Sequence, residues 1–409
     1  MTLLALVFTL FFSLISAAAS ATEAFPAAEF AYCSGVSGQR VTLVSPLSNW
    51  ELEDPQMQFR ETSPGCYALS IPEPWLSVLP YKFVVDGRWI SDPKNPNSEP
   101  DGYGNLNSLR VPKAFKPDPL LAPLKPDTEP GIEPLKRREL RIRDWNQSAR
   151  KLTLLYPAPS ASAPFATPPA TPGSSKHQET SLAQDSSNPE RLVLVVFQDG
   201  DDYLNRTGAA NLLARLGKES GMPALAGLFI PPRDRMAEYA MSETSDRYLD
   251  WLQDQVLPRA EQELRVRGRR QGNRWNVLTA TDRVLIGPSL GGLITTYTAI
   301  KKPWLFGFAA SQSGSFWFDN QRIVTLLQSA HEAPSLLFSG AALPELFLEV
   351  GTFEAPSMLS SNRAACQTAR KSGWNTHCRE YPSLHNWEGW ENRLSEILRT
   401  FLKRPAAPL

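Results

Sequence analysis

The segment GPSLGG, residues 287–292, places one serine among three glycines directly after the apolar run at 284–286. Small residues on both sides of Ser289 permit a strained turn between a strand and a helix, and such a turn presents the serine hydroxyl above a sheet. The pattern G-x-S-x-G alone is only moderately specific, because a serine that caps a helix beside closely packed glycines has the same composition. Ser289 is therefore a candidate nucleophile whose assignment depends on partners elsewhere in the chain.

A serine hydroxyl becomes a good nucleophile when a histidine accepts its proton and a carboxylate orients that histidine. The chain contains four histidines. His177 lies in a segment rich in Pro, Ala, Ser and Thr, His331 precedes the expected acid, and His377 lies in a predicted strand. His385 falls in the loop between the last predicted strand and the last predicted helix. We choose His385 as the base; its alternative role is to cap that helix.

The acid is expected in the segment PELFLEVGTFEAP, residues 344–356. Glu354 lies in the predicted loop past the strand, whereas Glu349 lies within the strand and is the second choice. The chain order Ser289, Glu354, His385 is the order of nucleophile, acid and base in the α/β-hydrolases. The agreement of three separate placements favours this triad over the motif taken alone.

The attack of a serine on an ester carbonyl produces an oxyanion, which needs N–H donors. The backbone N–H of Leu290, directly after the serine, is one expected donor. The turn at Gly200 and Asp201, after the apolar run LVLVVF at 192–197, is expected to supply the second.

These side chains need a sheet to bring them together. From residue 191 onward, apolar strand-like runs alternate with helical stretches, which predicts a mostly parallel, doubly wound α/β sheet covered by helices on both faces. Residues 135–156 predict an antiparallel pair of strands that opens this domain, which we assign to 135–405. Residues 157–190 are dominated by Pro, Ala, Ser and Thr and predict a disordered insertion within it.

The region before this domain has a different pattern. Residues 22–115 contain short runs of strand-forming residues between turns, which predicts an all-β module. Asp86 and Gly87 lie between two such runs and predict a two-residue hairpin. Residues 116–134 are rich in proline and predict an extended, semi-rigid linker.

Residues 1–21 form an apolar stretch that ends in small residues and predict a secretory signal peptide, so we expect a periplasmic or secreted protein. An uncleaved anchor is the alternative, because the stretch lacks an early Lys or Arg. If the signal is cleaved, no stable insertion into a membrane is expected. The balance of 42 basic and 42 acidic residues gives no global field that favours nucleic acid.

Export would permit disulfides, and the four cysteines fall into two local pairs. We expect Cys33 to pair with Cys66 and Cys366 with Cys378; free buried thiols are the alternative. Neither pair has a histidine at the spacing of a metal ligand, so no metal site and no organic cofactor are predicted.

The hydrolase region resembles the enterochelin (ferric catecholate siderophore) esterases within the esterase D-like and feruloyl esterase group. The resemblance covers residues 135–403 and rests on the segments VLIGPSLGGL, FAASQSGSFWF, LEVGTFEAP and HNWEGWENRL. It implies that Ser289, Glu354 and His385 are nucleophile, acid and base. The chain departs from the family pattern in having Pro288 before the serine, and Asn386 where Asp is common.

The resemblance also implies a surface that binds an anionic catecholate. Its candidates from the segment IPPRDRMAEY are Arg233, Arg235, Glu238 and Tyr239, with a plain surface loop containing internal ion pairs as the alternative. Ser315, Phe316 and Trp317 are candidates to line the pocket, although aromatic residues at this spacing also occur in cores.

The N-terminal region resembles the immunoglobulin-like early-set β-sandwiches, which include a glycogen-binding module, over YKFVVDGRWISDPKNPNSEPDGYGNLNSLRV. This resemblance implies that Trp50, Lys82, Trp89 and Asn107 bind a sugar. The alternative is a structural lid or part of a dimer that binds no glycan.

The overall prediction is an exported serine esterase with an α/β-hydrolase domain behind an immunoglobulin-like β-sandwich. The expected partner is a small-molecule ester, namely a ferric catecholate siderophore. An esterified polysaccharide cleaved by a feruloyl or acetyl esterase is the second possibility, and a binding protein with an inactive hydrolase fold is the third. The sequence predicts no oligomeric state.

Overall fold

The computed structural model describes residues 25–101, 104–125, 127–157, 191–270, 277–330 and 342–402. The expected signal peptide, nearly all of the expected insertion, His177 and His331 lie outside these residues. Within the described ranges, no helix is both long and apolar enough to cross a membrane.

The C-terminal domain is built on one sheet of eight strands in the order β16-β15-β14-β13-β11-β12-β10-β9. Neighbouring strands from β12 through β11 and β13 to β16 run parallel, whereas β9 and β10 form the predicted antiparallel pair at one edge. The strands are β9 Lys136–Arg143, β10 Ala149–Tyr156, β11 Leu192–Gln198, β12 Ala224–Ile230, β13 Arg283–Pro288, β14 Phe308–Gln312, β15 Glu345–Gly351 and β16 Thr376–Tyr381. The predicted doubly wound α/β fold is confirmed.

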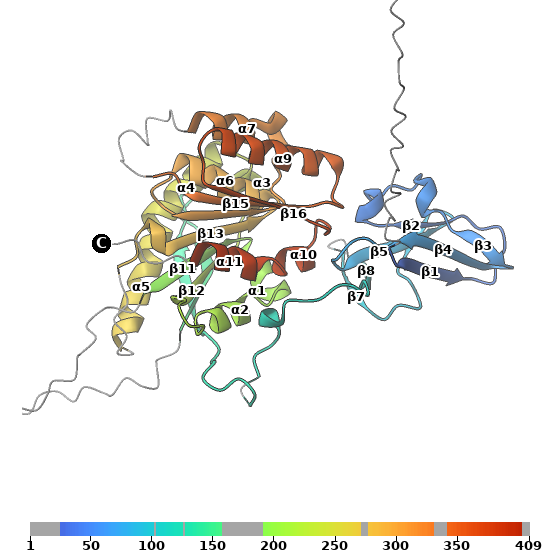
Figure 1. The fold of residues 1–409 in the computed structure, drawn as a ribbon, viewed down its shortest axis with the longest axis horizontal. Coiled ribbons are helices and arrows are strands. Elements are labelled where there is room, and N and C mark those ends of the chain that lie inside the picture. The colour runs from blue at the N-terminus through green and yellow to red at the C-terminus, as the bar shows by residue number, and fades with distance from the viewer. Residues whose placement is uncertain are drawn as a thin grey trace, which may run out of the picture.

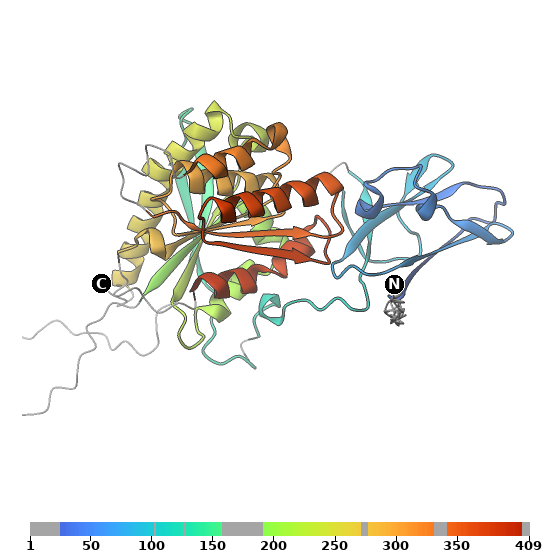
Figure 2. The same ribbon diagram turned by 45° about the horizontal axis from the view of Figure 1, so that its top comes forward.

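Helices cover both faces of this sheet (Figures 1 and 2). One face packs on α1 Gly200–Arg206, α2 Ala209–Leu216 and α11 Leu394–Leu402. The other packs on α4 Glu243–Trp251, α5 Leu257–Arg270, α6 Leu290–Lys301, α7 Phe318–Ser329 and α9 Pro356–Lys371. Every residue of β11, β12 and β15 is buried, as expected for parallel strands covered on two sides.

The N-terminal domain consists of two antiparallel sheets that share one apolar core. One sheet has the order β1-β4-β3, and the other has β2-β5-β8-β7 with β6 paired to β5. The strands are β1 Ala27–Cys33, β2 Val41–Val44, β3 Arg60–Ser63, β4 Cys66–Pro72, β5 Leu79–Val85, β6 Arg88–Ile90, β7 Ser98–Pro100 and β8 Leu106–Arg110. Asp86 and Gly87, at φ 48° and 83°, form the predicted hairpin turn between β5 and β6.

Two disulfides fix local geometry, with the pairing that the sequence suggested. Cys33–Cys66 joins paired positions of β1 and β4. Cys366–Cys378 ties α9 to β16, the edge strand of the large sheet.

The proline-rich segment between the domains is docked on the C-terminal domain over part of its length. Arg215 of α2 donates to the carbonyl oxygens of residues 120, 122 and 123 and pairs with Glu129. Asp118 N–H donates to Asn392 Oδ1, while Asn392 Nδ2 donates to the Lys116 carbonyl. The expected extended linker is therefore held along the C-terminal domain.

Candidate active site

Ser289 occupies a strained turn between β13 and α6. Its φ of 56° and ψ of −120° are unusual for a residue with a side chain. The turn needs glycine on both sides: a Cβ at Gly287 would lie 2.3 Å from the Gly291 carbonyl oxygen, and a Cβ at Gly291 would lie 2.6 Å from Asp199 Oδ2. Ser289 N–H donates to the Gln312 carbonyl at 2.8 Å, which fixes the turn to β14.

The three residues expected to form a triad meet at the carboxyl edge of the sheet. His385 Nε2 lies 3.1 Å from Ser289 Oγ, and His385 Nδ1 lies 2.7 Å from Glu354 Oε2. Because a carboxylate only accepts, Nδ1 carries the proton toward Glu354, which leaves Nε2 to accept the serine proton. A second serine, Ser315, lies 3.3 Å from Ser289 Oγ.

The other carboxylate oxygen of Glu354 is fixed by two donors. Gly351 N–H donates to Oε1 at 2.7 Å, and Ser313 Oγ donates to it at 2.5 Å. Trp390 Nε1 donates in turn to Ser313 Oγ at 3.0 Å, and its ring meets the His385 ring edge-on at 4.8 Å. Trp390 belongs to α10, Trp387–Glu391. This series of hydrogen bonds orients the Glu354 carboxylate, and the Trp390 ring packs against the His385 imidazole.

Glu349, the second choice for the acid, has a different environment. It is buried in β15, and its Oε1 accepts from Gln312 Nε2 at 2.7 Å. Burial raises the pKa of Glu349 to about 8, so its carboxyl is mainly neutral at pH 7. No hydrogen bond between described residues joins it to His385.

The expected oxyanion donors lie at the starts of two helices. Leu290 begins α6, and Gly200 and Asp201 begin α1, where backbone N–H groups have no acceptor within the helix. Gly200 packs so closely on β12 that a Cβ would lie 2.2 Å from Ile230 N. The preceding residue, Asp199, has a left-handed conformation with φ 53°.

Arg235 bonds to both turns that precede these helices, at Asp199 before α1 and at Pro288 before α6. Its Nε and Nη2 each donate to the Asp199 carboxylate at 2.8 Å, and Nη2 also donates to the Pro288 carbonyl at 3.2 Å. Asp199 is only 1% exposed, so it depends on this pairing. Arg235 therefore positions the turns around Ser289. Its expected contact with an anionic substrate stays a prediction, since its side chain is 37% exposed beside the Asp199 carboxylate.

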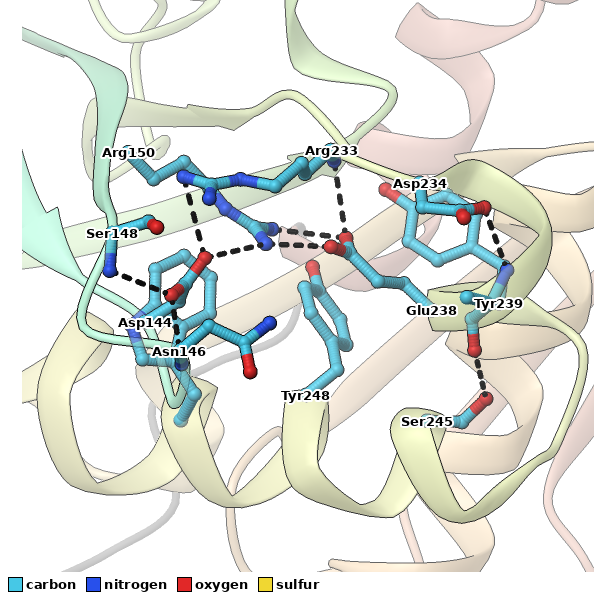
Figure 3. A network of polar contacts seen from close by, with 12 residues as sticks. Asp144, Asn146, Ser148, Arg150, Arg233, Asp234, Glu238, Tyr239, Ser245 and Tyr248 are labelled. Atoms are coloured by element: carbon cyan, nitrogen blue, oxygen red, sulfur yellow. Dashed lines mark hydrogen bonds and ion pairs between the residues drawn. The ribbon is translucent and has the colours of Figure 1, made fainter.

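The other charged candidates of the same segment, Arg233 and Glu238, join a polar network around Arg150 (Figure 3). Glu238 and Arg150 are buried, whereas the Arg233 side chain is 40% exposed and its expected contact with substrate stays a prediction. Arg150 Nη1 and Nη2 donate to both carboxylate oxygens of Glu238, while Asp144 lies 3.6 Å from Arg150 and 3.3 Å from Arg233. The rings of Trp145, Tyr248 and Trp251 surround the Arg150 guanidinium. Glu238 is 2% exposed and both its oxygens are occupied, so its expected role in substrate binding is corrected to a structural one.

Two aromatic candidates are also internal. Tyr239, in α3 Arg235–Tyr239, is fully buried, donates to Gln198 Oε1 and accepts from Asp199 N–H. Phe316 is fully buried as well. Their expected contact with substrate is therefore corrected, because neither ring reaches a surface. Trp317 is 48% exposed and remains a candidate for the pocket rim.

The residues expected to bind glycan are only partly accessible. Lys82 is 7% exposed and its Nζ pairs with Asp101 at 2.5 Å, while Asn107 is 9% exposed. Their expected hydrogen bonds to sugar are corrected by this burial. Trp89 is 48% exposed and Trp50 is partly exposed in a left-handed conformation.

Sequence reasoning missed four residues that shape the site: Ser313, Gln312, Trp390 and Asp199. Ser313 and Trp390 fall inside segments that carried the family resemblance, so their position near the motifs was the available signal. The described residues contain no group of three or more His, Cys, Asp or Glu side chains that could hold a metal ion.

Comparison with known proteins identifies the family of the chain. The model of the family described as "Putative esterase" matches residues 177–401, more than half of the chain. The chain belongs to this esterase family. The predicted family is thereby confirmed, and the expectation of a carboxylic ester hydrolase is confirmed at the level of the family.

Two bacterial proteins are similar in sequence to parts of this chain. YbbA of Bacillus subtilis, an uncharacterized protein, is 30% identical over 140 residues, which cover 31% of this chain and 51% of that protein. Iron(III) enterobactin esterase of Dickeya dadantii is 26% identical over 228 residues, which cover 53% of this chain and 49% of that protein. The chain spans about half the length of the curated relatives it matches.

Solved structures resemble the esterase over both domains. Ferric enterobactin esterase from Salmonella typhimurium superposes with a TM-score of 0.64 at 18% identity, covering 92% of this chain and 93% of that one. An enterobactin esterase from Shigella flexneri, determined in the presence of enterobactin, gives 0.61 at 18% identity and 92% coverage of both chains. These likenesses establish a shared two-domain fold.

The network in Figure 3 leads to a stability prediction. Replacing Arg150 with Met leaves the buried Glu238 carboxylate without its cation and removes one of the two cations near Asp144, so the free energy of unfolding should fall by about 3–5 kcal/mol. Urea unfolding measures this loss. Arg247→Ala, which removes an exposed pair with Glu243, is the control and should change the value by less than about 0.5 kcal/mol. A loss below about 1 kcal/mol in Arg150→Met would contradict this account.

Proposed function

We propose that this protein is an exported serine esterase that hydrolyses a carboxylic ester of a catecholate siderophore. The observation that carries the proposal is the geometry of the triad, with His385 within hydrogen-bond distance of both Ser289 and Glu354. The strained backbone at Ser289 supports it, because such a turn exposes the hydroxyl to a substrate.

The first half of the proposed reaction forms an acyl-enzyme. His385 Nε2 takes the proton of Ser289 Oγ while Oγ bonds to the ester carbonyl carbon, and the carbonyl π electrons move to its oxygen. The N–H of Leu290 and an N–H at the start of α1 stabilise that oxyanion. The carbonyl then re-forms, the bond to the alkoxide breaks, and His385 gives its proton to the departing alcohol.

Water completes the reaction by the same steps. His385 accepts a proton from water as its oxygen bonds to the acyl carbon, and the second tetrahedral intermediate collapses with the return of that proton to Ser289 Oγ. The products are a carboxylic acid and a free enzyme. Glu354 keeps the Nδ1 proton and stabilises the imidazolium that forms in each half.

The proposed substrate class rests on relatives and on one accessible side chain. Proteins named as enterobactin esterases occur among both the sequence relatives and the structures of similar fold. Trp317 is half-exposed and lies two residues after Ser315, whose hydroxyl contacts the nucleophile. It offers an aromatic surface on which an aromatic acyl group would stack. An esterified polysaccharide and an inactive binding protein are the other outcomes of the test below.

The first test is labelling followed by an ester panel. The full chain should react with a fluorophosphonate probe, with the label on Ser289 in mass spectrometry. It should then hydrolyse a cyclic catecholate triester faster than methyl ferulate or acetylated xylan. Ser289→Ala and His385→Ala should each lower kcat by a factor of about 10³ or more. Turnover of xylan acetate alone would redirect the proposal to a carbohydrate esterase, and absence of both label and turnover would favour a binding protein.

Glu354 and Glu349, the first and second choices for the acid, provide a matched pair of variants. Glu354→Gln replaces an acceptor of the Nδ1 proton by an amide and should lower kcat by a factor of about 10²–10⁴. Glu349→Gln replaces a carboxyl that is already mainly neutral, so kcat should stay within about threefold. Steady-state kinetics on the preferred ester measures both. Equal losses in the two variants would contradict the assignment of Glu354.

Glu349→Gln should also change how the free energy of unfolding depends on pH. The pKa of Glu349 in the folded chain, about 8, is above its ordinary 4.5, so the folded state binds the extra proton between these values. The stability that this proton contributes is complete below about pH 4.5 and is lost as the pH rises through 8. The free energy of unfolding of the variant, compared with that of the wild type, should fall less over this range.

Export is the remaining part of the proposal. Disulfides such as Cys33–Cys66 and Cys366–Cys378 persist in oxidising compartments, which supports a periplasmic or secreted protein. Intact mass spectrometry of the protein recovered outside the cytoplasm should give a chain that begins at Thr22 with both disulfides formed. Cytoplasmic protein that retains residues 1–21 and four free thiols would contradict export.

A further inference from the structure

The loop that carries His385 is contacted by a segment of the N-terminal domain. This segment, residues 75–78, connects β4 to β5. Leu76 N–H donates to the Pro382 carbonyl, Leu384 N–H donates to Ser77 Oγ at 3.0 Å, and Asn386 Nδ2 donates to the Val78 carbonyl. The last two bonds involve the residues directly before and after His385.

Apolar side chains also join the N-terminal domain to the loops that carry the base and the acid. Leu384 is fully buried and belongs to the core of the N-terminal domain, although it lies in the sequence of the C-terminal one. Trp75, 1% exposed, meets the ring of Phe353 edge-on at 6.5 Å. Since Phe353 precedes Glu354, the N-terminal domain contacts the neighbours of both the base and the acid.

The loop that carries the base, residues 382–386 (the base loop), is held only in part by its own domain. It leaves the edge strand β16 and reaches α10 within five residues, so neither a strand nor a helix holds His385 itself. Phe353 N–H donates to the Ser383 carbonyl, and Asn386 Oδ1 caps α10 by accepting from Gly389 N–H at 3.0 Å. Within the loop, Ser383 N–H donates to the Tyr381 carbonyl and Asn386 N–H to the Leu384 carbonyl. The contacts with residues 75–78 add hydrogen bonds from a second domain.

Asn386 is chemically matched to both of its contacts. Its Oδ1 accepts from Gly389 N–H while its Nδ2 donates to the Val78 carbonyl. An Asp at this position would keep the cap but would face a carbonyl oxygen with a second acceptor. The departure from Asp noted in the sequence therefore coincides with a contact that only the amide can make.

A second contact joins the N-terminal domain to the other side of the site. Glu99 of β7 pairs with Arg206 of α1 at 2.9 Å, and Arg206 lies over the ring of Trp387, directly after Asn386. Trp387 in turn packs edge-on against Tyr203 of α1. The domain therefore contacts the base loop and the helix that begins at the expected oxyanion donors.

We propose that the N-terminal domain is a positioning part of the active site. Ser77 holds the Leu384 backbone before His385 and Val78 holds the Asn386 side chain after it, which keeps His385 in the geometry that reaches Ser289. This inference rests on the proposed triad. It assigns the domain a role in catalysis through the base, separate from any binding of glycan.

The test uses two variants with matched controls in the full chain. Ser77→Ala leaves Leu384 N–H without its acceptor, and Ser77→Thr restores a hydroxyl. Asn386→Asp removes the donor to Val78. The controls are Ser70→Ala, which removes an exposed hydroxyl of β4 that donates to Glu29, and Asn375→Asp at an exposed turn. Active sites are counted by the extent of fluorophosphonate labelling, so that kcat refers to folded enzyme only.

We expect Ser77→Ala and Asn386→Asp to lower kcat per labelled site by about 10- to 100-fold with KM within about threefold, because a misplaced base slows chemistry more than binding. Ser77→Thr should recover most of the loss, and the controls should stay within about twofold of wild type. A purely structural role would lower the number of labelled sites and leave kcat per site unchanged, which would overturn the proposal.

Hydrogen exchange separates this inference from the proposed function. Peptides that cover residues 382–391 should exchange at least about tenfold faster in Ser77→Ala than in wild type, and Ser70→Ala should not change them. If wild type neither labels nor turns over an ester, the proposed function fails, and unchanged exchange would overturn the positioning as well. A loss of kcat without faster exchange, or faster exchange without a loss of kcat, would also overturn it.

Discussion

The active-site geometry depends above all on the hydrogen bond that His385 Nδ1 donates to Glu354 Oε2. It joins two loops that leave adjacent parallel strands, and it has to hold the imidazole 3.1 Å from a serine in the turn after a third strand. The sheet supplies the coarse placement, since the carboxyl ends of β13, β15 and β16 lie at one edge. The loops themselves need additional restraints, because loop backbone has more freedom than strand backbone.

Buried polar side chains provide those restraints around the acid. Trp390, Ser313 and Glu354 form one chain of donors and acceptors, and Tyr203 and Glu349 meet at Gln312 in another. Buried polar groups are costly when unpaired, so each such bond favours one arrangement of the loops strongly. The neutral carboxyl of Glu349 fits this logic, because a second anion beside Glu354 would disturb the electrostatics of the triad.

The sequence predicted the sheet, the triad and the hairpin because each follows from local pattern. Strand and helix periodicity and turn residues such as Asp86 and Gly87 are properties of short segments. The triad was found from three short motifs and from their order along the chain. The environment of Arg235 and Glu238 could not be predicted in the same way. Their partners are distant in sequence, Asp199 by 36 residues and Arg150 by 88, and a charged side chain looks the same in a loop whether it meets solvent or a buried counter-ion.

The backbone segments on either side of Ser289, the Asp199 turn and the base loop, are fixed by different parts of the protein. On one side, Arg235 bridges Asp199 and the Pro288 carbonyl, so the start of α1 and the serine turn move together within the hydrolase domain. On the other side, the base loop shares Leu384 with the core of the N-terminal domain. A site built in this way couples the geometry of its base to the docking of a second domain. The same β-sandwich can therefore be necessary for catalysis even though Lys82 and Asn107 are buried and cannot contribute to a sugar site.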